Sequence, residues 1–569
     1  MVRDFDIVVR GGMVLDGTGA EAVETDVGVL GGRIAAVGAG LGAGREEIDA
    51  RGRLVTPGFV DLHTHYDGQV TWADRMTPSS VNGVTTVVTG NCGVGFAPCR
   101  PADHEALISL MSGVEDIPEV VMADGLPWNW TSFAEYLDAV DARPHDVDIA
   151  ALVPHSALRV FVMGERAIAR EHATPADVAE MARLMREAMG AGAAGFATSR
   201  ALQHKSSKGD PIPTVRTAED ELQAIASVLG EAGRGVFQLL SDFDLFRDVE
   251  GEFAMFRRLA KTSGRPIMFT LQQKHNDPDE WRHLLRLSEQ ANDDGLPIRP
   301  QVHSRPTGLL LGYELSRNPF SSCAGMKALA GLSFADKVAA LRDPQRRAQI
   351  LAEAQEPRIA RQSDWARTFV LGEEPDYEQP LERSIESLAR ANGVSPAEYA
   401  YDALLGQDGH AMLLSAAQNY AEGSLEPTRE MMRHRDTLIA LGDAGAHCGL
   451  VCDASYTTSL LTHWTRDRRR GETVPLAWAV KSLTSEPARA IGLADRGEIR
   501  AGLRADLNVI DYDRLTSHAP RIVYDLPTGG KRLVQDAQGY DATLVAGQAT
   551  YRGGEAMGPL PGRVVRFNA

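Results

Sequence analysis

Residues 58–67 read Gly58-Phe59-Val60-Asp61-Leu62-His63-Thr64-His65-Tyr66-Asp67. Pro57 precedes this stretch and Gly68 follows it, so its apolar part is short, as is typical of a strand. Residues two apart in a strand point to the same side, so His63 and His65 share a face and could hold one metal ion together. The alternative is that the two imidazoles only hydrogen-bond to neighbouring groups. The stretch therefore predicts a strand that ends in a polar site.

The central part of the chain repeats a β-rich run followed by a helical pattern, which indicates a parallel sheet built from βα units. One helix is predicted after Thr174-Pro175, because a capping hydroxyl and a first-turn proline precede an apolar stripe at helical spacing. The eight β-rich runs are residues 59–62, 84–89, 149–153, 194–198, 236–241, 267–271, 298–302 and 437–442. Eight strands close a barrel, so the sequence predicts the α/β class and a (β/α)8 TIM-like barrel.

Both ends of the chain carry short β-rich runs separated by glycine turns. The first of these regions is too small for a stable sheet of its own, so we expect residues 497–547 to supply partner strands. We therefore expect one small domain from residues 1–56 plus 492–569, and a barrel from residues 57–491. The seventh and eighth runs are about 130 residues apart, more than a βα crossover needs. An inserted, lid-like segment is expected at about residues 305–436.

The composition excludes several classes of protein. Lys and Arg total 59 against 77 Asp and Glu, a net charge of −18, which opposes binding to nucleic acid or to an anionic membrane surface. Acidic residues follow Met1 where a signal peptide would be basic and apolar, so a cytoplasmic location is expected. The five cysteines form no CxxC pair, so neither a disulfide framework nor a zinc ribbon is indicated. A small-molecule substrate fits these limits, and assembly into a homo-oligomer stays open.

Catalytic residues of such barrels lie at the C-terminal ends of the strands. The residues found at or just after the predicted strand ends include His63, His65, Cys92, His155, Arg200, Asp242, Lys274, His303, Arg305 and Asp443. Two imidazoles, a thiolate and a carboxylate are a ligand set for Zn²⁺, so His63, His65, Cys92 and Asp443 are the predicted metal ligands. A zinc ion would activate water and polarise a carbonyl, and Asp443 would transfer the proton. The alternatives are a helix cap for Asp443 and a small buried apolar residue for Cys92.

Five of these strand-end residues are predicted to contact substrate. A substrate with a free carboxylate would favour an arginine or lysine near the mouth of the barrel. The candidates are His155, Arg200, Lys274, His303 and Arg305. Each could instead pair with a structural group, and the sequence does not separate the two roles.

With these residues in place, the chain resembles the amidohydrolase superfamily and, within it, the D-aminoacylase group of N-acyl-D-amino-acid deacylases. The resemblance rests on Gly11-Gly12 with Asp16-Gly17-Thr18-Gly19, Pro57 through His65, Gly83-Val84-Thr85-Thr86-Val87-Val88 through Cys92-Gly93, Ala151-Leu152-Val153 with His155, Asp443, Pro487-Ala488-Arg489-Ala490-Ile491-Gly492-Leu493, and Gly502-Leu503-Arg504-Ala505-Asp506-Leu507. It implies a metal-bearing barrel with a composite β-sandwich that hydrolyses C–N bonds. It also implies that Cys92 matches the thiolate ligand of the D-aminoacylases, and that Asp443 is both ligand and general base.

The chain departs from the family at the second metal position. In the family, histidines end the fifth and sixth strands, but residues 236–241 and 267–274 contain none here. We therefore expect one zinc ion rather than two, with His204, Lys205 and His275 as candidates to complete the ligand set. The predicted function is deacylation of N-acyl (D-)amino acids or related small amides. Two alternatives remain: a cyclic-amide hydrolase of the hydantoinase or dihydroorotase kind, and a barrel that has lost catalysis and serves as a binding or scaffold protein.

Overall fold

Eight parallel strands form the central sheet of the computed structural model, which describes residues 4–241, 243 and 248–567. In chain order these strands are β6 (Phe59–Asp61), β7 (Val84–Thr89), β8 (Asp148–Pro154), β9 (Gly195–Ser199), β10 (Val236–Leu240), β11 (Ile267–Thr270), β12 (Ile298–Val302) and β16 (Leu438–Ile439). Each strand lies beside the next one in this order. All eight β-rich runs predicted from the sequence therefore contribute a strand.

The sheet closes into a barrel just beyond its two edge strands. After β6 and β16 the chain forms a parallel bridge between Thr64 and Ala444. The amide of His65 donates to the carbonyl of Ala444 at 2.7 Å, and the amide of Asp443 donates to the carbonyl of His63 at 3.1 Å. The predicted (β/α)8 architecture is confirmed, and the first and last strands meet where the predicted metal ligands lie.

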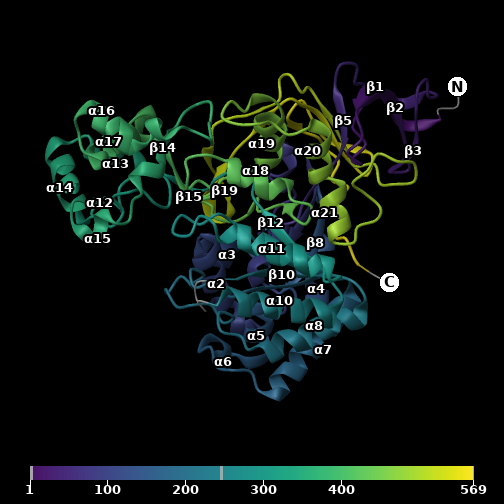
Figure 1. The fold of residues 1–569 in the computed structure, drawn as a ribbon, viewed down its shortest axis with the longest axis horizontal. Helices are drawn as coiled ribbons and strands as arrows, with labels where there is room; N and C mark the ends of the chain where they lie inside the picture. Colours follow the sequence, from purple (N-terminus) through teal and green to yellow (C-terminus); the bar gives the residue numbers. More distant parts are fainter. Residues whose placement is uncertain (1–3, 242, 244–247, 568–569) are drawn as a thin grey trace.

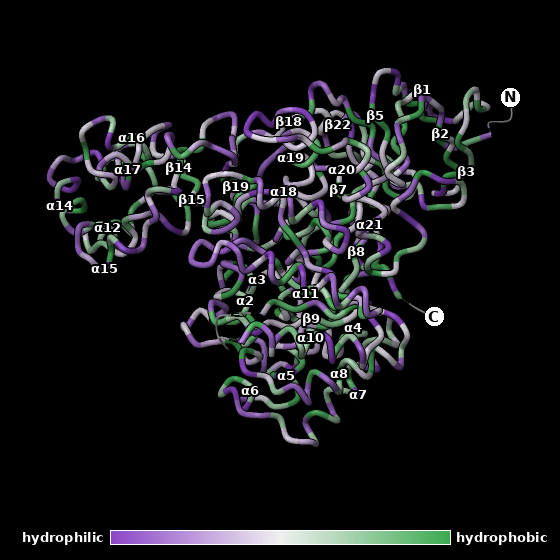
Figure 2. The backbone as a smooth tube through the Cα atoms, in the orientation of Figure 1, coloured by the Kyte–Doolittle hydropathy of each residue, from purple (hydrophilic) through white to green (hydrophobic). Residues whose placement is uncertain are grey.

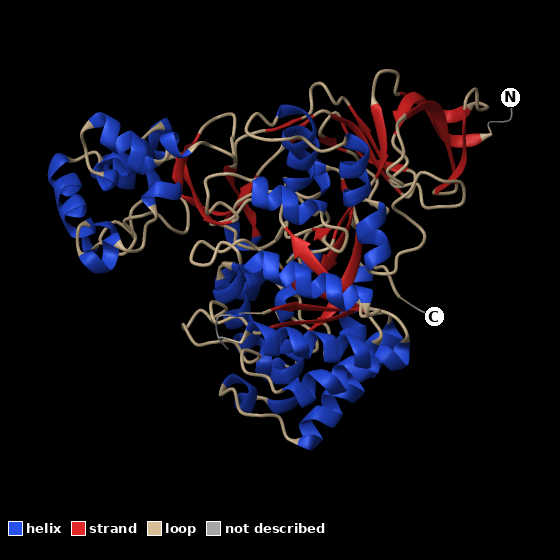
Figure 3. Cartoon of the chain, in the orientation of Figure 1, coloured by secondary structure: helices blue, strands red, loops and turns tan. Residues whose placement is uncertain are grey.

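Helices surround this barrel (Figures 1 and 3). They include α2 (His104–Glu115), α3 (Glu119–Gly125), α4 (Phe133–Asp141), α5 (His155–Met163), α7 (Pro175–Ala191), α8 (Glu219–Ala232), α10 (Val249–Ser263), α11 (Glu280–Asp293), α18 (Glu426–Arg433), α19 (Tyr456–Thr462), α20 (Leu476–Leu483) and α21 (Ser485–Ala490). The predicted start of α7 is confirmed, since the Thr174 side chain accepts from the Asp177 amide and Pro175 is in the first turn. Among the described residues, no helix has both the length and the apolar character to cross a bilayer.

A nine-stranded sheet joins the two ends of the chain. Its strands are β1 (Phe5–Val14), β2 (Val23–Leu30), β3 (Arg33–Gly38), β4 (Gly44–Asp49), β5 (Leu54–Pro57), β17 (Leu507–Ile510), β22 (Tyr540–Val545), β23 (Gln548–Arg552) and β24 (Glu555–Ala556). The ends meet where β5 pairs antiparallel with β17. Gly58 then leads from β5 into β6, and glycine is required because a Cβ there would lie 2.2 Å from the Thr85 hydroxyl oxygen.

Most of the chain between β12 and β16 forms a separate lobe. Its three-stranded sheet consists of β13 (Thr307–Leu311), β14 (Thr368–Leu371) and β15 (Met412–Gln418), and its helices are α12 (Ala324–Lys327), α13 (Phe334–Leu341), α14 (Pro344–Ala354), α15 (Pro357–Ala360), α16 (Ile385–Asn392) and α17 (Pro396–Leu404). These helices project away from the barrel (Figure 1), and hydrophilic residues colour much of their outer end around α14 (Figure 2). The lobe has its own apolar core, which includes Tyr313, Phe320 and Tyr401.

Candidate metal centre

Four potential metal-binding atoms converge at the closure of the barrel. Asp443 Oδ1 lies 3.5 Å from His63 Nε2 and 3.5 Å from His65 Nε2. Cys92 Sγ lies 3.4 Å from His63 Nε2. The ligand atoms of His63, His65 and Cys92 all lie within 4.8 Å of one another. The structure therefore brings all four predicted ligands together.

Local backbone geometry places the two ligand candidates that do not follow the first strand. Cys92 lies in a short 3-10 turn after β7 and has φ 54°, while Asp443 follows β16 with φ 44°. Residues other than glycine adopt positive φ only at a cost, and such residues cluster at functional sites. His63 and His65 are almost completely buried, whereas the side chain of Asp443 is 26% exposed. Of these ligand candidates, Asp443 is thus the most accessible to a substrate.

Two glutamines support these ligands from inside the barrel. Gln301 on β12 has its Oε1 atom 2.9 Å from His63 Nδ1, which leaves His63 Nε2 to face the other ligand atoms. Gln238 on β10 accepts a hydrogen bond of 3.0 Å from the Cys92 amide. The sequence analysis missed both, although an amide side chain inside a buried apolar strand is a usable signal.

Glu115 and His447 also belong to this site and were missed. Glu115 is the last residue of α2 and is 1% exposed. Its Oε1 atom lies 3.4 Å from His65 Nδ1, and its Oε2 atom lies 3.5 Å from His447 Nε2. In a sequence, an acid at a helix end such as Glu115 looks like a solvent-exposed residue. His447 was a reasonable candidate, because it lies only four positions after Asp443.

Burial and neighbouring charges shift the pKa values of the four ligand candidates. Burial lowers the pKa of His63 to about 4, so this ring is neutral at pH 7 and able to ligate metal. Burial also acts on His65, but the charge of Glu115 and contact with Asp443 raise its pKa well above the usual value. Burial raises the pKa of the Cys92 thiol to about 11. Burial disfavours the charged form of Asp443, yet His65 and His63 hold its pKa well below its usual range.

The donor set fits a zinc ion. Four-coordinate zinc with bonds of about 2.0 to 2.3 Å places neighbouring donor atoms about 3.3 to 3.6 Å apart, and three pairs of the candidate donor atoms lie at 3.4 or 3.5 Å. The thiol favours zinc over magnesium, which prefers oxygen ligands. His65 Nδ1 and Glu115 Oε2 are buried, and neither atom has a hydrogen bond of regular geometry in the described part of the chain. The outer ring nitrogen of a metal-bound histidine commonly donates to a carboxylate, so these two side chains fit the surroundings of a metal ion.

The five predicted substrate contacts each have a partner of their own. His155 Nε2 lies 2.6 Å from Glu221, Arg200 lies 2.7 Å from Glu252, and Lys274 lies 2.8 Å from Glu280. His303 lies 3.6 Å from Asp453. Arg305 stacks over the ring of Tyr377 at 4.3 Å and donates 2.7 Å to Ser455 Oγ. Each therefore has a partner within the protein.

The remaining candidates for completing the ligand set have different surroundings. His204 Nδ1 lies 3.0 Å from Ser199 Oγ, and burial, together with the nearby His65 and His447, lowers its pKa to about 3. His275 lies 3.9 Å from Asp364, outside the four-ligand cluster. The backbone of Lys205 forms an isolated antiparallel β-bridge with that of Pro211. Asp242 lies outside the described residues.

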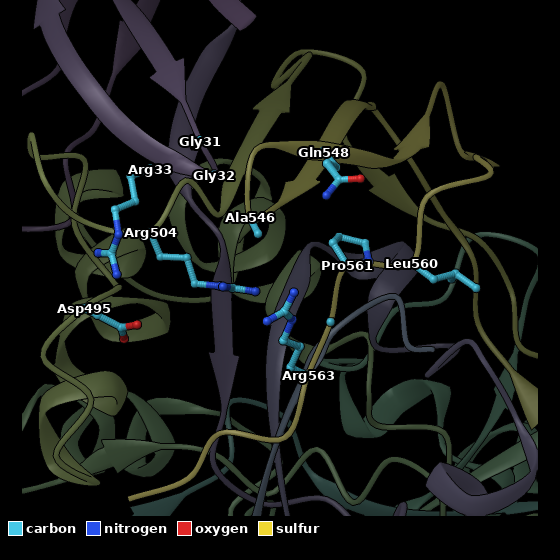
Figure 4. A pocket seen from close by; sticks show the side chains of 11 residues that line it. Gly31, Gly32, Arg33, Asp495, Arg504, Ala546, Gln548, Leu560, Pro561 and Arg563 are labelled. Carbon is cyan, nitrogen blue, oxygen red and sulfur yellow. The ribbon is translucent and has the colours of Figure 1, made fainter. Parts of the chain in front are cut away.

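Two cavities are separate from the four-ligand cluster. A cavity of about 420 Å³ is lined by Arg33, Arg504 and Arg563 among others, between the terminal sheet and the chain's C-terminal segment (Figure 4). A cavity of about 650 Å³ is lined by Arg305 together with Tyr377 and His463. Of the five predicted substrate contacts, Arg305 is the one that lines the larger cavity.

Residues 46–551 match the Amidohydrolase family. The chain belongs to this family. The amidohydrolase is therefore a hydrolase of carbon–nitrogen bonds other than peptide bonds, and the resemblance predicted from its sequence is confirmed.

Curated relatives and solved structures agree with this assignment. The amidohydrolase is 26% identical over 581 residues to the N-acyl-D-glutamate deacylase of Alcaligenes xylosoxydans xylosoxydans, covering 100% of this chain and 98% of the relative. It is 40% identical over 197 residues to the D-aminoacylase of the same organism, covering 34% and 38% of the two chains. A solved D-aminoacylase structure matches with a TM-score of 0.66 at 25% identity, over 99% of this chain and 100% of that one.

Proposed function

We propose that this amidohydrolase is a zinc-dependent deacylase of N-acyl-D-amino acids or closely related small amides. The observation that carries the proposal is the convergence of His63, His65, Cys92 and Asp443, in which three pairs of donor atoms lie 3.4 to 3.5 Å apart. The relatives named for D-amino-acid substrates support the choice of substrate class. In the proposed division of the chain, residues 57–491 form the catalytic barrel, residues 1–56 with 492–569 form the composite domain, and the insertion spans about residues 305–436.

One zinc ion is proposed rather than two. The matching D-aminoacylase is described as having a binuclear metal centre, with activation by one metal and attenuation by a second. Here β10 carries Gln238 near the centre, and the Gln238 amide oxygen already binds the Cys92 backbone. An amide oxygen in this position does not replace a histidine as a zinc ligand. The position of Gln238 therefore supports a centre that binds one zinc ion.

In the proposed amide hydrolysis, the histidines hold the metal ion and Asp443 transfers the proton. When bound, zinc would lower the pKa of a water molecule and polarise an amide carbonyl. His63 and His65 would hold the ion from one strand, with Gln301 fixing the ring of His63. Asp443 Oδ1 faces the histidines, so Oδ2 is the atom that would take the proton from water and pass it to the leaving amide nitrogen. One amide bond and one water become a carboxylate and an amine.

The substrate contacts remain predictions within this proposal. His155, Arg200 and Lys274 pair with Glu221, Glu252 and Glu280, respectively. His303 and Arg305 both follow β12, the strand whose Gln301 contacts His63, so these two are the better placed of the five. Either would bind the substrate carboxylate only after giving up a present contact.

The deciding experiment is a substrate comparison with the zinc-reconstituted protein. N-acetyl-D-amino acids and their L-enantiomers would be assayed beside hydantoin and dihydroorotate. We expect turnover of the N-acyl-D-amino acids above the other classes. Turnover of the cyclic amides alone would overturn the deacylase assignment in favour of a ring-opening hydrolase, and no turnover with stoichiometric zinc in place would favour a binding protein.

A further inference from the structure

Glu115 is a buried acid that touches two histidines and is not among the four ligand candidates. Its carboxylate oxygens lie 3.4 Å from His65 Nδ1 and 3.5 Å from His447 Nε2. The side chain is 1% exposed, and no lysine or arginine pairs with it among the described residues. Burying a carboxylate without a partner costs several kcal/mol, so its position between two imidazoles requires an explanation.

The backbone around Glu115 anchors the loop that follows the last barrel strand. The carbonyl of Glu115 accepts a hydrogen bond from the amide of His447. The next residue, Asp116, accepts hydrogen bonds from the Gly449 amide at 3.2 Å and from the Ser316 hydroxyl at 2.8 Å. The end of α2 therefore holds the segment that carries Asp443, while the Glu115 side chain reaches His65 on the other side of the closure.

The geometry points to Glu115 as a positioning residue of the metal centre. Its Oε1 atom lies 3.4 Å from His65 Nδ1, a distance that shortens to a hydrogen bond with a small shift, and the other ring nitrogen, Nε2, lies 3.5 Å from Asp443 Oδ1. Histidines that bind metal commonly donate their other ring N–H to a carboxylate, which fixes the tautomer and orientation. The second carboxylate oxygen lies 3.5 Å from Nε2 of His447, whose side chain is 24% exposed. This inference rests on the proposed metal-dependent function.

The competing explanation is that Glu115 only docks α2 on the barrel. A docking role would be shared with Asp116, whose contacts are with the same loop and with Ser316. In that case loss of the Glu115 carboxylate would lower stability but leave the metal affinity of the folded protein unchanged. The two roles therefore differ in a measurable property besides activity.

The test measures metal binding by wild type, Glu115→Ala, Glu115→Gln and the control Glu105→Ala. Glu105 lies on the same helix, with its side chain 90% exposed. Zn²⁺ affinity would be measured by competition with a chelator, and the visible spectrum would be recorded with Co²⁺ bound. We expect Glu105→Ala to match wild type and Glu115→Ala to bind zinc about 10- to 100-fold more weakly, with an altered Co²⁺ spectrum. Glu115→Gln should lie between them, because its amide oxygen can still accept from His65.

Unchanged zinc affinity and an unchanged Co²⁺ spectrum in folded Glu115→Ala would overturn the positioning role while leaving the proposed function in place. Absence of metal binding in wild type would instead remove the proposed function. If Glu115→Ala does not fold, Glu115→Gln carries the same comparison. ¹⁵N NMR of the metal-free protein adds a readout that needs no metal: His65 Nδ1 should carry a hydrogen in wild type, and an Nδ1 without hydrogen would contradict the inference.

Discussion

Asp443 Oδ1 lies 3.5 Å from His65 Nε2, and the two residues follow the last and first strands of the barrel. Changing Asp443 to Asn keeps the size of the side chain but removes its charge and its ability to accept a proton. General acid–base groups contribute about 10²- to 10⁴-fold to rate, so kcat for an N-acyl-D-amino acid should fall within that range. Steady-state kinetics on the zinc-loaded variant would check this. A kcat within threefold of wild type would show that another group moves the proton.

Metal content should depend on each of the other three ligand candidates. His63→Ala, His65→Ala and Cys92→Ala should each weaken zinc binding by more than the roughly 10- to 100-fold that loss of an outer-shell partner costs. Mass-spectrometric metal analysis after dialysis would measure the stoichiometry, and wild type should retain one equivalent. Cys323→Ala is a matched control, because Cys323 is buried in the core of the inserted lobe. Full zinc retention by all three variants would remove the proposed centre.

Glu378 ties the inserted segment to the barrel through Arg468. Both Glu378 oxygens accept from Arg468 at 2.9 Å, and His463 Nε2 lies 3.1 Å away. Burial would raise the pKa of Glu378, but these hydrogen bonds from His463 and Arg468 lower it to about 2. An acid whose pKa is lower in the folded protein stabilises it above the unfolded-state pKa, which is about 4.3, and this stabilisation is lost as the pH falls towards 2.

Glu378→Gln should therefore loosen the contact at pH 7, and its difference from wild type should disappear as the pH falls from about 5 to 2. Hydrogen exchange of residues 463–468 would measure the effect. Glu374→Gln is the control, because Glu374 lies exposed in the same segment. A difference that is the same at pH 7 and pH 2.5 would contradict the assigned role of the carboxylate.

Asp148 neutralises two arginines at the start of β8. It lies 2.6 Å from Arg496 and 2.8 Å from Arg504, and it is 2% exposed. Asp148→Ala would leave a buried guanidinium short of one partner, although Asp495 still pairs with Arg496. The loss should be about 3 kcal/mol, the lower end of the range for breaking a buried ion pair.

Urea unfolding would measure the change at Asp148. The control Asp49→Ala breaks an exposed pair with Arg51 and should leave stability nearly unchanged, because water and salt screen that pair. Equal losses from the two substitutions would show that burial of the Asp148 network adds nothing.

The fold was largely predictable because each barrel strand is short, β-rich and bounded by turn residues. Residues 84–89 and 298–302 were predicted with the bounds that β7 and β12 have in the structure. The last strand was harder, since only Leu438 and Ile439 are regular, and the following backbone turns into the site with positive φ at Leu441 and Asp443. Local pattern does not encode that change of direction.

The site was predictable only where a residue type and a strand end coincided. His63, His65, Cys92 and Asp443 met that condition, and Glu115 did not because it reaches the centre from a helix end. Gln238 and Gln301 are buried amides inside apolar strands, a signal that marks an interior polar contact without indicating its partner. Long-range packing, rather than local sequence, decides which groups they meet.

The bridge between Thr64 and Ala444 also sets an order of events during biosynthesis. On the ribosome, a growing chain exposes His63, His65 and Cys92 long before residue 443 is made, so its thiol and imidazoles lack their carboxylate partner throughout that interval. The proposed ligand set is complete only when the last strand docks beside the first. Zinc that binds at that stage would prefer the closed barrel to open forms and would therefore stabilise the folded state.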